Sequence, residues 1–163
     1  MWKTLLAITL AVLSFFSSYT SIRAYNLDPR SAKMRTVLLK YHSPMVGLEN
    51  TLIQTADKYN LDWTILAAIA GTESSFAKRM PANCINPYGW GIYGDHKLCF
   101  ESIEAAIEGV ASGLAGKYNT TSITTIARTY NSVSTDGWIN HTSFFMNKIK
   151  SAEIPVELLP VTL

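Results

Sequence analysis

The chain has little charge for its 163 residues, and no excess of either sign that would favour a charged partner. Its 14 Lys and Arg side chains nearly balance 12 Asp and Glu side chains, for a formal net charge of +2. A protein that binds nucleic acid or a strongly anionic surface normally needs a basic surplus. We therefore expect no nucleic-acid partner and a neutral or mixed-polarity ligand.

Cysteine is scarce as well, with Cys84 and Cys99 as the only two. In an exported chain an even count favours a disulfide, whereas in a reduced compartment the pair would be two free thiols. A zinc site is not indicated, because the two cysteines with His96 between them lack a fourth ligand at a familiar spacing. No metal and no organic cofactor is expected.

Long hydrophobic runs are few, and one of them, an uncharged apolar stretch from Leu5 to Phe16, lies at the N-terminus. It is too short for a membrane span, which needs roughly 20 apolar residues. Lys3 before it and Ala24 after it predict a secretory signal peptide over residues 1–24. The alternative is an uncleaved anchor, because Ile22 is not the small residue preferred before a cleavage site, and only then is membrane contact expected. Cleavage would remove Lys3 and Arg23 and leave 12 charges of each sign.

The rest of the chain reads as one mainly α domain, without repeats or alternating strands and helices. Residues 25–46 are interpreted as a linker and a short helix from about Met34, residues 47–150 as the main domain, and residues 151–163 as a tail. The segment from Trp63 to Ser74 is apolar nearly all round, which predicts a buried central helix with Asp62 as its N-cap. Apolar spacing predicts the other helices over residues 47–60, 101–118, 122–130 and 138–150.

Residues 79–100, RMPANCINPYGWGIYGDHKLCF, differ from the helical segments on either side. Prolines and glycines punctuate this stretch, and both cysteines lie in it. Such residues favour turns, so we expect an irregular loop or short hairpin pinned by the disulfide.

Glu73 is a lone acid at the end of the apolar run LDWTILAAIAGT. The C-terminal end of a helix and apolar neighbours both raise the pKa of a carboxyl, whereas Lys78 and Arg79 would lower it. If the first two effects prevail, Glu73 can act as a general acid near neutral pH. The alternative, which spacing alone favours, is a solvated glutamate paired with Lys78.

Two segments together resemble a known family. ADKYNLDWTILAAIAGTESSFAK is similar to the catalytic helix of the lysozyme-like superfamily, especially the soluble lytic transglycosylases, and IARTYN is similar to that family's Ala-Tyr-Asn segment. Between them, NPYGWGIYG lacks the usual Gly-Leu-Met-Gln run and is closer to a loop of bacterial endo-glucosaminidases. The resemblance covers roughly residues 47–150 and implies a lysozyme-like single domain with a buried catalytic helix.

The resemblance also implies roles for single residues. Glu73 would be the catalytic acid, Ser74 and Ser75 would form hydrogen bonds at the helix end, and the backbone of residues 89–91 would approach a saccharide. Aromatic rings in the Gly-rich loop can stack on sugar faces or form the loop's own small core; we expect both, with Trp90 as the main sugar contact. The expected substrate-binding residues are Ser75, Tyr88, Trp90, Gly91, Tyr93, Tyr130 and Asn131.

Most glycosidases use two carboxylates, and only one is evident here. The resemblance to transglycosylases implies that Glu73 alone protonates the bridging oxygen and then assists the sugar's own 6-hydroxyl. A hydrolase would need Asp95, Glu101 or another acid to position water. Asp95 is the candidate in the aromatic loop, whereas Glu101 suits the start of the following helix, where its charge favours the helix dipole. The alternative, which the sequence YGDH favours, is that Asp95 is a turn residue.

The expected protein is a monomeric peptidoglycan-cleaving enzyme that is secreted, periplasmic or associated with the cell wall. Its bond would be the one between N-acetylmuramic acid and N-acetylglucosamine. The alternatives are a hydrolase, either an endo-N-acetylglucosaminidase or a muramidase, and a catalytically inactive wall-binding module.

Overall fold

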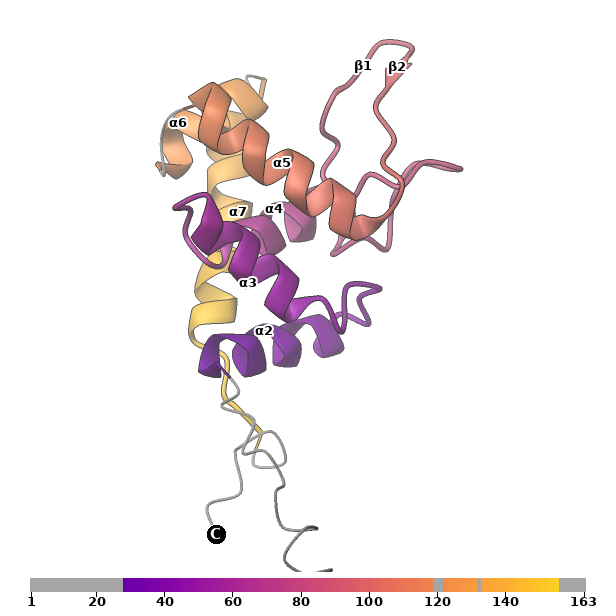
Figure 1. Cartoon of the computed structure of the whole chain (residues 1–163). Helices are drawn as coiled ribbons and strands as arrows, with labels where there is room; N and C mark the ends of the chain where they lie inside the picture. Colours follow the sequence, from indigo (N-terminus) through magenta and orange to yellow (C-terminus); the bar gives the residue numbers. More distant parts are fainter. Residues whose placement is uncertain (1–27, 119–121, 132, 156–163) are drawn as a thin grey trace, which may run out of the picture. The chain divides into compact units, whose positions relative to one another are not determined.

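The computed structural model describes residues 28–118, 122–131 and 133–155 (Figure 1). The predicted signal peptide and residues 156–163 of the predicted tail lie outside these residues. Within the described part the chain is mainly helical, which confirms the predicted class. Its elements are α2 (Pro29–Lys40), α3 (Glu49–Lys58), α4 (Ile65–Ser74), β1 (Ile92–Tyr93), β2 (His96–Lys97), α5 (Ile103–Tyr118), α6 (Ile123–Tyr130) and α7 (Thr135–Lys150).

Helix α4 forms the centre of the core, as its apolar sequence predicts. Every residue from Ile65 to Gly71 is buried. The helix packs most extensively against α7 and also contacts α3 and α5. Each fully buried Leu or Ile side chain here contributes roughly 1.5–3 kcal/mol to folding. The helix that carries Glu73 is thus fixed by packing on several sides.

The start of α4 differs slightly from the prediction. The helix begins at Ile65 and has Thr64 at the N-cap position, while Asp62 stabilises the preceding turn by accepting a hydrogen bond of 2.9 Å from the Thr64 backbone N–H. Lys150, at the end of α7, pairs with the other Asp62 oxygen at 2.6 Å. Burial raises the pKa of Asp62, but the hydrogen bonds from Lys150 and Thr64 together outweigh it and hold the pKa below its usual value.

The prediction that residues 29–33 belong to a linker is wrong. Helix α2 begins at Pro29, and the Asp28 side chain accepts a hydrogen bond of 2.9 Å from the Arg30 backbone N–H. An N-cap Asp followed by Pro is a favourable helix start, because proline lacks only an N–H that would have no partner there. Helix α2 buries Met34 and Leu38 and packs against α3 and α7, so it belongs to the core.

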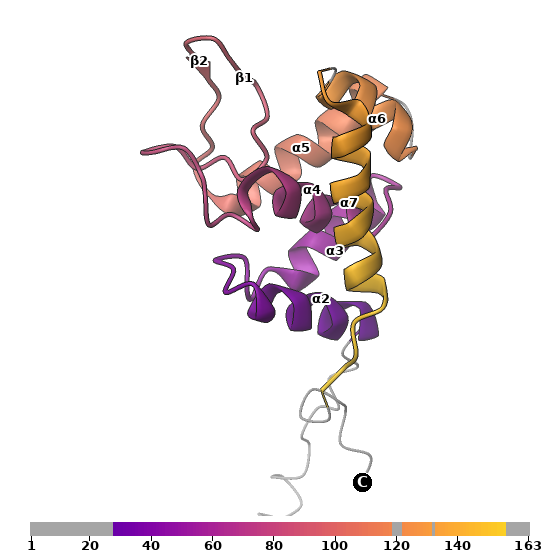
Figure 2. The same ribbon diagram turned by 180° about the vertical axis from the view of Figure 1, so that it is seen from behind.

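Residues 79–100 form the expected irregular loop with a short hairpin. Strands β1 and β2 pair antiparallel, with Tyr93 opposite His96, and the hairpin stands out from the helices in both views (Figures 1 and 2). The predicted disulfide between Cys84 and Cys99 closes this loop. Among the described residues, none of the helices is both long and apolar enough to cross a membrane.

Candidate functional site

Glu73 lies in the last turn of α4, where the chain reverses abruptly. The three residues Ser75, Phe76 and Ala77 all have positive φ, at 52°, 58° and 66°. Residues with a Cβ adopt this conformation only when their surroundings compensate for the strain. Here Phe76 is fully buried, with its ring centroid 4.9 Å from those of both Tyr41 and Phe145. The reversal ends the helix at Ser74 and leaves the Glu73 side chain at the surface.

Two groups from distant segments meet the Glu73 carboxyl. The indole Nε1–H of the buried Trp138 side chain in α7 donates a hydrogen bond of 2.6 Å to Oε1. On the other side, a Cβ placed on Gly89 would lie 3.4 Å from Oε2, so the loop backbone passes beside that oxygen. The alternative pairing with Lys78 is not formed, and Glu73 takes part in no ion pair within the described part of the chain.

This setting raises the pKa of Glu73. The side chain is exposed along one edge, but the protein around it removes enough hydration for burial to raise the pKa, while the hydrogen bond from Trp138 lowers it. Burial is the larger effect, so the net direction is upward. The carboxyl therefore holds a proton at higher pH than a fully solvated glutamate, as a general acid requires.

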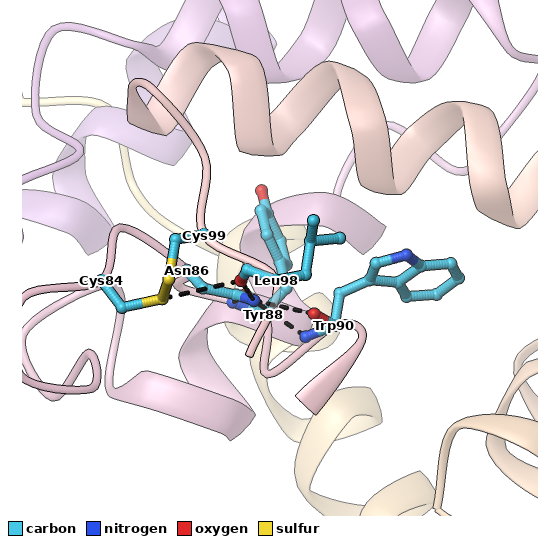
Figure 3. Close-up of a disulfide and its surroundings, with 6 residues drawn as sticks. All are labelled: Cys84, Asn86, Tyr88, Trp90, Leu98 and Cys99. Carbon is cyan, nitrogen blue, oxygen red and sulfur yellow. Dashed lines mark hydrogen bonds between the residues drawn. A yellow bond between two sulfur atoms is a disulfide. The ribbon is translucent and has the colours of Figure 1, made fainter. Parts of the chain in front are cut away.

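Ser74 and Asn86 fasten the loop to the end of α4. The Ser74 hydroxyl donates to the Pro87 carbonyl at 2.7 Å and accepts from the Ala77 N–H at 2.9 Å. The buried Asn86 amide nitrogen donates to the carbonyls of Trp90 at 2.8 Å and Leu98 at 2.7 Å (Figure 3). The helix-end role expected of Ser74 is confirmed, whereas Asn86 was missed because an Asn before Pro reads as an ordinary turn residue.

Aromatic rings from three segments line up beside the acid. The centroids of Trp90 and Tyr130 are 5.5 Å apart, and those of Tyr130 and Trp138 are 5.2 Å apart. The Tyr130 hydroxyl donates to the Tyr88 carbonyl, which joins α6 to the loop. The Trp90 indole points away from the disulfide (Figure 3) and packs on Gly113 of α5, where a Cβ would meet the ring at 2.5 Å. We call Trp90, Tyr130 and Trp138 the aromatic row.

The other predicted site residues are dispersed. The Tyr88 side chain is fully buried, and its hydroxyl has no hydrogen-bond partner among the described residues, so this ring belongs to the hydrophobic core that the loop shares with the helices. Tyr93 is 69% exposed and stacks on His96 in the hairpin. Asp95 is exposed in the hairpin turn, the position that YGDH favours.

The remaining two polar predictions lie at helix ends. Ser75 is the C-cap residue of α4 and is half-buried. The Asn131 side chain accepts a hydrogen bond of 2.9 Å from the Ser134 N–H and so shapes the turn before α7.

Gly91, the remaining predicted residue, packs on Leu98, where a Cβ added to the glycine would lie 3.0 Å from the Leu98 Cβ. Its positive φ of 68° and that close approach explain why glycine stands there.

Trp138 is the site residue that sequence reasoning missed. It lies 65 positions after Glu73 and occupies an ordinary core position on the face of α7. An indole N–H needs a partner when it is buried, and that need is the one signal that could have pointed to an acceptor nearby. Among the described residues, no group of three or more His, Cys, Asp or Glu side chains is placed to hold a metal ion.

Comparison with known protein families, curated protein sequences and solved structures finds no match to this chain. The site is therefore interpreted from its chemistry. The site combines a carboxyl of raised pKa, the Trp138 N–H that donates to it, the backbone of Gly89 beside it, and the aromatic row. This arrangement suits acid–base chemistry on a ligand with apolar faces.

Proposed function

We propose that the protein is an exported lytic transglycosylase with a lysozyme-like fold. It would cleave the glycosidic bond between N-acetylmuramic acid and N-acetylglucosamine in peptidoglycan. The observation that carries this proposal is the Glu73 carboxyl, which has a raised pKa at the surface end of a buried helix. The resemblance of this helix and of IARTYN to the soluble lytic transglycosylases supplies the reaction.

In this reaction one carboxyl serves as acid and then as base. Protonated Glu73 gives its proton to the bridging oxygen, while the bond from that oxygen to the anomeric carbon breaks and its electron pair stays with the oxygen. The Glu73 carboxylate then takes the proton of the sugar's own 6-hydroxyl as O6 bonds to the anomeric carbon. The products are an anhydro sugar and a free hydroxyl, Glu73 is protonated again, and no water is consumed.

The surroundings of Glu73 support a sugar ligand. Gly89 is exposed beside Oε2, so a ligand can reach this oxygen over bare backbone. Trp90 and Tyr130 are partly exposed members of the aromatic row, and sugar rings stack their apolar faces on such side chains. The Cys84–Cys99 disulfide favours an oxidising compartment, which agrees with export.

Two other functions remain as alternatives. A hydrolase, either an endo-N-acetylglucosaminidase or a muramidase, is favoured by the sequence NPYGWG, but it requires a second acid to position water. Asp95 is the residue considered for that role, and it occupies the exposed hairpin turn. A catalytically inactive wall-binding module would use the aromatic row without the acid.

The deciding experiment is mass spectrometry of fragments released from purified peptidoglycan. We compare residues 25–163 with Glu73→Gln, and with Glu104→Gln as a matched control on the exposed face of α5. We expect the unaltered protein and Glu104→Gln to release anhydro-muropeptides, and Glu73→Gln to release none. Products with reducing ends would favour the hydrolase and a test of Asp95. Binding without fragments would favour the wall-binding module, and full activity of Glu73→Gln would overturn the role of Glu73.

A further inference from the structure

The two oxygens of the Glu73 carboxyl are not equivalent. Oε1 accepts a hydrogen bond of 2.6 Å from Trp138 Nε1–H, and an indole nitrogen can only donate. In the protonated acid, the carbonyl oxygen is the better acceptor and the hydroxyl oxygen the poorer one. The indole therefore keeps the carbonyl character on Oε1, and the proton resides on Oε2.

We propose that Trp138 is a positioning residue, which holds Glu73 so that its transferable proton sits on Oε2 and faces the exposed backbone at Gly89. That this proton is transferred to a glycosidic oxygen rests on the proposed function. The hydrogen bond that places the proton on Oε2 does not depend on any substrate. Gly89 is exposed and its Cβ position lies 3.4 Å from Oε2, so a leaving oxygen can approach this side of the carboxyl over backbone that carries no side chain. It follows that the scissile bond must approach over the loop at Gly89.

Trp138 is itself held firmly. Its side chain is only 3% exposed, and its ring lies 5.2 Å from that of Tyr130. Tyr130 is in turn anchored through its hydroxyl to the Tyr88 carbonyl. Helices α6 and α7 and the loop therefore fix the direction of the indole N–H together, as a positioning role demands.

Other charges near this pair are few. Glu73 forms no ion pair in the described part of the chain, and the Trp138 hydrogen bond is the one polar contact that lowers its pKa. Burial holds the pKa of Tyr88 above its usual value, so that phenol stays neutral. The other titratable groups on α6, on α7 and in the loop of residues 75–100 are Lys78, Arg79, Tyr93, Asp95, His96, Lys97, Arg128, Tyr130, Asp136, His141, Lys148 and Lys150.

The first test measures the titration of Glu73 directly, by NMR of protein labelled with ¹³C at the glutamate carboxyl carbon. Glu73→Gln identifies the resonance. Trp138→Phe keeps an aromatic ring but removes the donor, so the midpoint of Glu73 should move to higher pH. Thr142→Val is the matched control, because it removes the 3.0 Å hydroxyl contact between Thr142 and Thr72 in the same interface of α4 and α7. Its midpoint should stay at the wild-type value.

A second measurement needs no Trp138 variant and so does not depend on that variant folding. In the unaltered protein, the indole ¹H–¹⁵N resonance of Trp138 should titrate with the same midpoint as the Glu73 carboxyl. In Glu73→Gln that dependence on pH should disappear. An indole resonance that does not respond to pH, or equal midpoint shifts in Trp138→Phe and Thr142→Val, would overturn the proposal.

Activity on peptidoglycan then separates this proposal from the proposed function. Trp138→Phe should lower kcat on the order of tenfold with little change in KM, and should move the basic limb of the pH profile to higher pH. Thr142→Val should leave that limb in place. If the wild-type protein releases no fragments while the NMR midpoints behave as expected, the positioning role stands and the proposed function fails.

Discussion

Glu73 combines an exposed edge with a protein environment that disfavours its charge. Folding therefore places a carboxyl where its ionised form is less stable than in water, and among the residues that the structure describes Trp138 alone offsets part of that cost. Groups that serve chemistry often carry this kind of cost, because the same desolvation that tunes a pKa weakens the folded state. The consequence can be measured as a dependence of stability on pH.

For stability, we expect Glu73→Gln to melt at a higher temperature than the wild-type protein at pH 7. Because the pKa of Glu73 is raised in the folded state, wild-type stability falls as pH rises through the usual glutamate pKa towards the folded one. Glutamine does not titrate, so the difference in Tm should shrink at pH 4. Circular dichroism melts at both pH values check this, with Glu104→Gln as background for the loss of one carboxyl. A difference that grows at pH 4 would contradict the direction of the shift.

At Gly89 the prediction concerns access to the acid. Gly89→Ala should reduce kcat/KM on the order of tenfold, because its methyl group would lie 3.4 Å from Oε2 on the side open to substrate. Backbone strain at φ 61° adds about 1 kcal/mol of destabilisation. Gly94→Ala is the matched control, since Gly94 has φ 54° and nothing within 4 Å of its Cβ position. Equal activity losses in the two variants would assign the effect to strain alone.

Among the elements, the loop of residues 84–99 depends on side chains for its shape because it has little regular structure of its own. The Asn86 side chain donates hydrogen bonds to the carbonyls of Trp90 and Leu98, and so joins the two sides of the loop where no strand pairing does. The Ser74 hydroxyl joins the loop to α4. Such side-chain bonds within a loop cannot be distinguished in the sequence from ordinary turn residues, because both use Asn, Ser, Gly and Pro. This is why the loop was predicted but its central residue was not.

Replacing Asn86 tests this interpretation. Asn86→Ala removes the buried amide that donates to the part-buried carbonyls of Trp90 and Leu98, so the free energy of unfolding should fall by about 1–3 kcal/mol. Unfolding in urea, followed by circular dichroism, measures the loss. Asn140→Ala, at an exposed position of α7, is the matched control and should change stability by less than about 0.5 kcal/mol. Similar losses in both variants would show that Asn86 does not organise the loop.

Across the whole molecule, local signals predicted more than long-range ones. The nearly continuous apolar segment from Trp63 to Ser74 predicted α4 and its burial, and the cysteine count predicted the disulfide. The start of α2 was readable from Asp28 and Pro29 but was overlooked, and the domain consequently begins earlier than expected. The hydrogen bond from Trp138 to Glu73 could not be predicted from the sequence. Apolar periodicity indicates which face of a helix is buried, but not which residues of other elements that face contacts.

The disulfide should contribute to the stability of the whole chain. With a sequence separation of 15, the cross-link between Cys84 and Cys99 is worth about 3 kcal/mol in the chain-entropy account. Urea unfolding with and without reductant should show a loss of this size. The double variant Cys84→Ser with Cys99→Ser should match the reduced protein and should not respond to reductant. A reduced protein as stable as the oxidised one would contradict the estimate.

The distance along the chain between Glu73 and Trp138 also has a consequence for synthesis. Helix α4 leaves the ribosome well before α7, which is its most extensive packing partner and carries the donor to Glu73. A nascent chain that has grown only as far as α6 thus has its acid but lacks the group that orients it. The site is assembled only after Trp138 has been synthesised, so premature termination before Trp138 yields fragments without the oriented acid.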